Sequence, residues 1–139
     1  PGISAAQGAA AALGFSLTER REARRVQFVT GHGADGRLPA DIDWKAIADP
    51  RATTVVYMPR KTLAGFVGSA VAHGLSPDMP ALAVASATRS NQRHVSGTVS
   101  SIAVLADDLT PGAPVIVIIG QVARSEASAA ARPILKKVA

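Results

Sequence analysis

The sequence predicts a single α/β domain with a mixed five-stranded sheet flanked by helices. Short runs rich in β-branched residues alternate with helix-like stretches, and a length of 139 residues suits one hydrophobic core. The connections between the runs differ in length. Because long crossovers join parallel strands and short returns join antiparallel ones, the sheet is expected to contain both kinds of pair.

Five segments have the composition of strands. They are Val26–Thr30, Thr53–Met58, Ala81–Ser86, Val95–Ser100 and Val115–Ile119. A helix between the second and third segments predicts a right-handed parallel crossover. The short stretch from Ala87 to Arg93 predicts an antiparallel return.

Four segments have helical patterns. Ser4 and Gln7 have the spacing of a capping box, and Gly14 stands where such a helix would end. Asp43 is placed to cap a second, short helix. The expected helices are the alanine-rich run from Ser4 to Leu13, Trp44–Ala48, Lys61–Ala72 and Ile102–Asp107.

The formal charge of +5 is concentrated in two places. Residues 121–139 carry +3 of it, from two arginines and two lysines against one glutamate. We therefore expect a folded domain over residues 1–120 and a basic, flexible tail over residues 121–139.

The second place is an arginine cluster formed by Arg20, Arg21, Arg24 and Arg25. Glutamates interrupt it, and the aromatic side chains that stack on bases in single-strand binders are missing. The cluster suits either a solvated face or a clamp for a small polyanion. A nucleic-acid module stays open as an alternative, for which a salt-steep affinity would be the signature.

Several classes of site have little support. The chain has no cysteine, and His32, His73 and His94 form no metal-binding motif, so no metal is expected. No G-x-S-x-G elbow for a nucleophilic serine is present. The apolar run Val115–Ile119 is too short to cross a membrane, and a cytoplasmic protein is the simplest interpretation.

The segment from Gly31 to Gly36 matches G-x-G-x-x-G after a predicted strand. A dinucleotide site would need a helix to follow, but Pro39 cannot sit inside that helix. We expect a glycine-rich loop at a strand end instead, where His32 serves either as a substrate contact or as a structural histidine.

Short motifs recur in a specific order along the chain. They are Pro1-Gly2-Ile3-Ser4-Ala5-Ala6, Leu17-Thr18 with Arg20, Val29-Thr30-Gly31-His32, Val55-Val56-Tyr57-Met58, Asp78-Met79-Pro80, Thr88 with Gln92-Arg93, and Val117-Ile118-Ile119-Gly120. From Pro1 to Arg124 this order resembles the C-terminal half of the uroporphyrinogen-III C-methyltransferases, in the tetrapyrrole methylase superfamily. The sequence leaves open whether the parent is a stand-alone methyltransferase or the end of a fused siroheme synthase.

The resemblance implies an S-adenosylmethionine-dependent enzyme that methylates uroporphyrinogen III twice to give precorrin-2, in siroheme or cobalamin synthesis. It implies that Ser4, Ala5, Met58 and Ala87 contact the methyl donor. Separately, the substrate's carboxylates suggest a binding role for Arg20, Arg21 and Arg60, together with His32. Met58 as core filler and Ala87 as a turn residue are the structural alternatives.

The sequence also departs from the family pattern. Ser4 replaces threonine, which keeps the hydroxyl, and Pro59 replaces glycine, which removes an amide donor. Ser86-Ala87 replaces Asn-Gly, and an alanine has less access than a glycine to positive φ.

The family's first domain has no counterpart here. We expect an N-terminal domain to complete the cleft, the catalytic acid and base to lie outside this chain, and the isolated fragment to be inactive. Family members are homodimers, so the chain is expected to dimerise. Two alternatives remain open, namely a non-catalytic dimerisation domain and another member of the tetrapyrrole methylase superfamily.

Overall fold

A computed structural model describes residues 1–124 of the chain. Within these residues five strands form one open sheet in the order β1-β2-β5-β3-β4. The strands are β1 (Arg25–Thr30), β2 (Ala52–Tyr57), β3 (Pro80–Ala85), β4 (Arg93–Thr98) and β5 (Val115–Ile119). The predicted α/β class and the mixed five-stranded sheet are confirmed.

The sheet combines parallel and antiparallel pairs. Strand β1 pairs with β2 in parallel, whereas β5 is antiparallel to both of its neighbours, β2 and β3. Strand β4 returns antiparallel to β3, as the short stretch before it predicts. The crossover from β2 to β3 keeps the two strands in the same direction, but β5 is inserted between them, so they do not pair directly.

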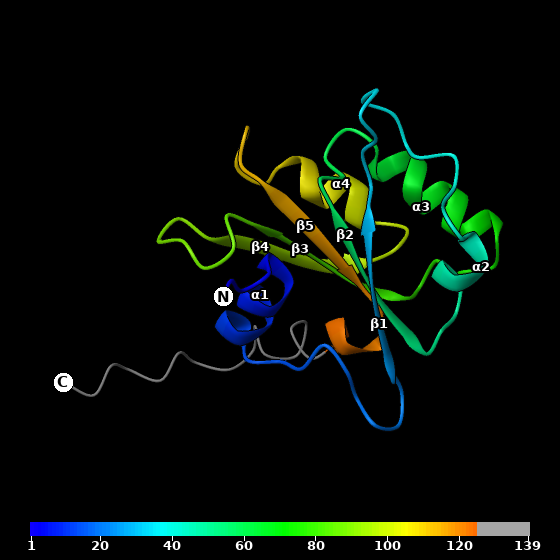
Figure 1. The fold of residues 1–139 in the computed structure, drawn as a ribbon, viewed down its shortest axis with the longest axis horizontal. Coiled ribbons are helices and arrows are strands. Elements are labelled where there is room, and N and C mark those ends of the chain that lie inside the picture. Colours follow the sequence, from blue (N-terminus) through cyan, green and yellow to red (C-terminus); the bar gives the residue numbers. More distant parts are fainter. Residues whose placement is uncertain (125–139) are drawn as a thin grey trace.

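Helices cover the two faces of the sheet unequally. Figure 1 shows α2 (Trp44–Ile47), α3 (Leu63–Ala72) and α4 (Ile102–Asp107) on one face, and α1 (Ala5–Leu13) with the 3₁₀ turn η1 (Gln121–Ala123) on the other. The first face has bulky core residues, among them Phe66 beneath Trp44 at 5.3 Å between ring centroids. The second face packs mainly small residues of α1 on the strands.

Two predicted strands extend one residue too far at their C-terminal ends. Met58 has φ of 53° and Ser86 has φ of 51°, so the chain turns into the left-handed region immediately after β2 and β3. A side chain in that region cannot continue a strand. Strand β4 begins two residues earlier than predicted because Arg93 pairs with Ala85.

The helix ends follow the expected capping chemistry at α1 and α2. Ser4 and Gln7 form the predicted capping box, and Gly14 closes α1 with φ of 78°. Asp43 accepts a hydrogen bond from the Ala46 N–H at 3.0 Å and caps α2. Helix α3 begins at Leu63, two residues later than expected, because Thr62 bonds to preceding carbonyls instead of capping with its side chain.

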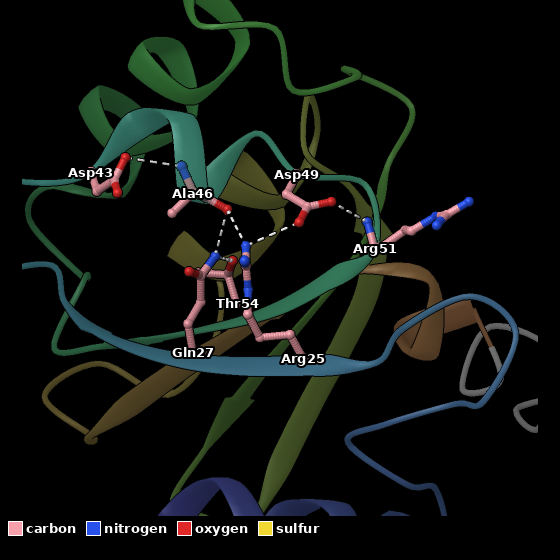
Figure 2. Close-up of polar contacts among 7 residues, drawn as sticks. All are labelled: Arg25, Gln27, Asp43, Ala46, Asp49, Arg51 and Thr54. Atoms are coloured by element: carbon pink, nitrogen blue, oxygen red, sulfur yellow. Dashed lines mark hydrogen bonds and ion pairs between the residues drawn. The ribbon is translucent and has the colours of Figure 1, made fainter.

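A polar network fastens α2 to the first two strands (Figure 2). Gln27 donates to the carbonyl of Ala46 at 2.9 Å and to the hydroxyl of Thr54 at 2.8 Å. Arg25 forms an ion pair with Asp49 at 3.1 Å. These contacts hold α2 and the residues after it against β1 and β2.

The packed domain extends beyond residue 120. In η1, Val122 and Ala123 are buried against the face that carries α1. Residues 121–124 therefore belong to the folded part, and the remainder of the expected tail lies outside the described residues. Within residues 1–124, the helices are too short or too polar to cross a membrane.

Candidate functional site

The candidate site lies at the carboxyl end of the sheet, defined as the end where β1, β2 and β3 finish and β5 begins. The register places Tyr57 opposite Ile116, and Ala85 opposite both Val115 and Arg93. The loops after β1, β2 and β3 therefore emerge side by side. In open α/β sheets, ligands bind in crevices outside the carboxyl ends of strands.

A cavity of about 380 Å³ opens at this end. This volume falls in the range of small-molecule sites. Four of the sequence-predicted residues line it, namely Ala5, His32, Met58 and Arg60. The other lining residues are Tyr57, Lys61, Ala113, Pro114, Val115 and Ile116.

The start of α1 forms one side of the site. The hydroxyl of Ser4 accepts from the Gln7 N–H at 3.3 Å and donates to the Gln7 side chain at 3.0 Å, so it is engaged in the capping box. The hydroxyl oxygen of Tyr57 accepts from the Ala6 N–H at 3.2 Å. Among the described residues, the Ala5 N–H has no hydrogen-bond partner, and it is the amide that remains for a polar ligand.

Met58 forms a second side. It is 58% exposed despite its apolar side chain, and its left-handed backbone turns it away from the line of β2. Met58 is therefore not core filler. An unbranched thioether in such a position suits an adaptable wall for a flat or sulfur-bearing ligand.

The loop after β3 is more strained than its sequence suggested. Ser86 and Thr88 have φ of 51° and 66°, whereas Ala87 between them is outside the positive-φ set. Ala87 is half-buried and packs beside the core on the α1 face, so it does not line the cavity itself. Strained non-glycine residues persist only where surrounding contacts hold them, and such residues cluster at functional sites.

Arg60 connects the cavity to the loop between α4 and β5. Its Nη2 donates to the carbonyls of Leu109 at 3.0 Å and Thr110 at 2.9 Å. Its buried Nε has no hydrogen-bond partner among the described residues. The guanidinium therefore fixes a loop that borders the cavity.

His32 is held at the cavity by the glycine before it. Gly31 donates its N–H to the Tyr57 carbonyl at 2.8 Å and accepts from the Thr62 hydroxyl. A Cβ at Gly31 would lie 2.9 Å from Val56 and 3.2 Å from Pro59. Only glycine allows this approach, which brings His32 next to the loop after β2.

Arg20 and Arg21 are not brought to the cavity. They precede β1 and lie at the amino end of the sheet, where the chain forms a small bridge between Glu19 and Ala23. Strand β1 separates them from His32 by about 16 Å at roughly 3.3 Å per residue. Arg20 instead borders a separate hollow of about 550 Å³ with Thr18, Glu19 and Arg24.

Within residues 1–124, no three histidine or acidic side chains come close enough together to hold a metal ion. Tyr57 is among the cavity residues that sequence reasoning missed, and it both lines the cavity and bonds to α1. The available signal was its position beside Met58 at a strand end, but its partner lies 51 residues away in sequence.

Comparison with known proteins agrees with this geometry. The family described as Tetrapyrrole (Corrin/Porphyrin) Methylases matches residues 1–103. A siroheme synthase of Thioalkalivibrio sulfidiphilus is 42% identical over 89% of this chain and 25% of its own length. A uroporphyrinogen-III C-methyltransferase of Paracoccus denitrificans is 40% identical over 88% of this chain and 42% of its own length.

A solved structure shares the fold. It is a uroporphyrin-III C-methyltransferase from Thermus thermophilus complexed with S-adenosylhomocysteine, with a TM-score of 0.73 and 26% identity. The match covers 90% of this chain and 52% of that one. The chain thus spans between a quarter and about half the length of these relatives. Since the family match covers 103 of its 139 residues, the chain belongs to the tetrapyrrole (corrin/porphyrin) methylases.

Proposed function

We propose that this chain forms part of an S-adenosylmethionine-dependent C-methyltransferase that methylates uroporphyrinogen III twice to give precorrin-2. The observation that carries the proposal is the cavity at the carboxyl end of the sheet, where Ala5, His32, Met58 and Arg60 converge. The Thermus relative solved with S-adenosylhomocysteine supports a donor of this kind.

The donor contacts follow from the chemistry of the site. The unbonded Ala5 amide at the start of α1 suits a polar or anionic group of the donor, and Ser4 holds that helix start in place. The Met58 side chain provides a polarizable wall beside the adenosine or the sulfonium. Ala87 contributes to donor binding through the backbone of its loop.

The reaction joins the donor's methyl carbon to a nucleophilic pyrrole carbon. The sulfur–methyl bond breaks and its electron pair stays on sulfur. The methylated ring carbon carries no hydrogen, so the proton is lost from a neighbouring atom of the tetrapyrrole. Such a displacement depends on alignment of the two reacting atoms more than on a covalent protein nucleophile. The role of this chain is therefore to hold the donor with its methyl group facing the tetrapyrrole.

The same cavity suits the tetrapyrrole's entry. His32 and Arg60 line it, and both side chains can donate hydrogen bonds to the tetrapyrrole's carboxylates. The role predicted for Arg20 and Arg21 stays a prediction, because these residues lie at the opposite end of the sheet. They could contact the substrate only if another part of the protein held it at that end of the sheet.

A second domain completes the site in this proposal. Met58 is 58% exposed at the cavity, and Ile3, two residues before the lining residue Ala5, is 82% exposed; such a domain would cover this apolar surface. The greater length of the relatives supports it.

We also propose a cytoplasmic homodimer that does not bind nucleic acid. Sedimentation with and without donor, and retention on RNA or DNA at low salt, check these points.

The direct test is methyl transfer by the full-length protein. With methyl-labelled S-adenosylmethionine and uroporphyrinogen III, the product should carry two labelled methyl groups. Residues 1–139 expressed alone should show no turnover. A folded full-length protein that binds the donor but leaves uroporphyrinogen III unmodified would contradict this substrate assignment, and other tetrapyrroles would then be compared as acceptors.

A further inference from the structure

We infer that Gln92 is a positioning residue for the donor site, acting through the backbone of Thr88. Its side-chain oxygen accepts a hydrogen bond from the Thr88 N–H at 2.6 Å. The inference rests on the proposed donor site and adds a residue to which no role has been given.

The loop from Ser86 to Thr88 needs such support. A β-branched residue at positive φ is a steric outlier, and Thr88 has φ of 66°. Ser86, with φ of 51°, sits two residues earlier, so Ala87 is flanked by two strained positions. A conformation of this kind persists only when contacts around it over-determine it.

Three contacts hold Ser86 and Thr88, namely one from the residue before β5, one from the far end of the same loop and one from α1. The Ser86 N–H donates to the Pro114 carbonyl at 2.9 Å, just before β5. The half-buried Gln92 precedes β4, and its oxygen anchors Thr88 from that side. The third contact is with α1, at Gly8.

Gly8 and Thr88 fit together because glycine has no Cβ. A Cβ at Gly8 would lie 2.6 Å from Cγ2 of Thr88, far inside normal contact. The loop methyl therefore packs directly on the helix that begins with Ser4 and Ala5. This contact couples the two elements that the proposed donor site uses, the start of α1 and the loop containing Ala87.

Substitutions at Gln92 test the inference in the full-length protein. Gln92→Ala and Gln92→Leu remove the acceptor, and S-adenosylhomocysteine should then bind about tenfold more weakly in calorimetry. Gln92→Glu keeps an acceptor oxygen and should restore the affinity to within about twofold. The KM for the tetrapyrrole should change less than the donor's Kd in each variant.

Gln121→Ala is the matched control, because it makes the same truncation at the amino end of the sheet. It should leave donor affinity unchanged. Donor affinity within twofold of wild type in both Gln92→Ala and Gln92→Leu would overturn the inference. An absence of donor binding in the wild-type protein would overturn the proposed function instead.

The coupling through Gly8 has its own test. Gly8→Ala should weaken donor binding, because the new methyl displaces Thr88. Thr88→Ser removes Cγ2, so the double variant should regain most of the affinity lost in Gly8→Ala. An equal loss from Gly8→Ala in both backgrounds would show that the contact does not position the loop.

Discussion

The two ends of the sheet meet the same backbone demand with different residues. At the amino end, the residue that directly follows β5 is Gly120, and it has positive φ. At the carboxyl end, Met58, Ser86 and Thr88 hold positive φ with side chains attached, and within residues 1–124 they are the non-glycine residues that do so. A glycine adopts positive φ at little steric cost, so Gly120 needs no role beyond its turn. Residues that keep a side chain at positive φ are strained, which indicates that their geometry or their side chain serves a function.

Polar side chains also differ between the two ends. At the amino end Asp49 and Glu19 accept hydrogen bonds from nearby backbone amides and stabilise turns, and Asp49 also pairs with Arg25 of β1. At the carboxyl end Tyr57 and Arg60 reach across to other elements, and Gln92 bonds to Thr88 within the loop between β3 and β4.

Replacing Gly120 should destabilise the fold without affecting ligand binding. With φ of 146° and ψ of 173°, it occupies a region that is essentially limited to glycine, and a Cβ would lie 3.0 Å from the Ala52 carbonyl oxygen. Gly120→Ala should lower the free energy of unfolding by about 3 kcal/mol in urea denaturation. Gly65→Ala, in an open position of α3, should instead stabilise by about 0.5 kcal/mol or more. An unchanged free energy of unfolding in Gly120→Ala would contradict the difference described between the two ends of the sheet.

Arg60→Ala should lower the free energy of unfolding by about 2 kcal/mol, because a charged donor to two loop carbonyls is lost. The same variant should weaken donor or tetrapyrrole binding, since the loop between α4 and β5 borders the cavity. Denaturation and calorimetry on one preparation separate these effects. A loss of stability with unchanged binding would limit Arg60 to a structural role.

Substitutions at Met58 should weaken donor binding without lowering the free energy of unfolding. Met58→Ala should weaken donor binding about tenfold, or roughly 1.4 kcal/mol, with little change in stability because the side chain is exposed. Met58→Gly should bind as weakly while stabilising the fold by about 1 kcal/mol, since glycine relieves the left-handed strain. Wild-type affinity in both variants would remove Met58 from the site.

The smallest effect is expected at Arg25, in the network of Figure 2. Its ion pair with Asp49 joins side chains that are 50% and 36% exposed. Arg25→Ala should therefore cost about 0.5 kcal/mol or less, and less still at high salt. A larger, salt-independent loss would mean that Arg25 stabilises α2 mainly through its bond to the Ala46 carbonyl.

Much of the fold could be predicted because its signals are local. The capping box of Ser4 and Gln7, the Asp43 cap and the apolar strands all act over a few residues. The insertion of β5 between β2 and β3 could not be predicted, since it depends on pairing across the whole domain. The strand ends were misplaced at Met58 and Ser86 because these residue types give no local signal for positive φ.

The candidate site could be predicted in part. Ala5, His32, Met58 and Arg60 line one cavity. The resemblance indicates Ala5 and Met58, the glycine-rich loop indicates His32, and charge indicates Arg60. Arg20 and Arg21 were grouped with them on charge alone, and charge does not reveal which end of a strand a residue occupies. The contacts of Tyr57 with Ala6 and of Gly8 with Thr88 link distant segments, so only the folded chain shows them.

The two methionines of the chain allow the most direct test of the donor site. Met58 lies exposed at the cavity, whereas Met79 is buried near the amino end. With methionine methyl groups labelled with carbon-13 in the full-length protein, and Met58→Leu to assign the signal, S-adenosylhomocysteine should shift the Met58 resonance and leave that of Met79 in place. Saturable binding that leaves the Met58 resonance unchanged would contradict a donor site at the carboxyl end of the sheet.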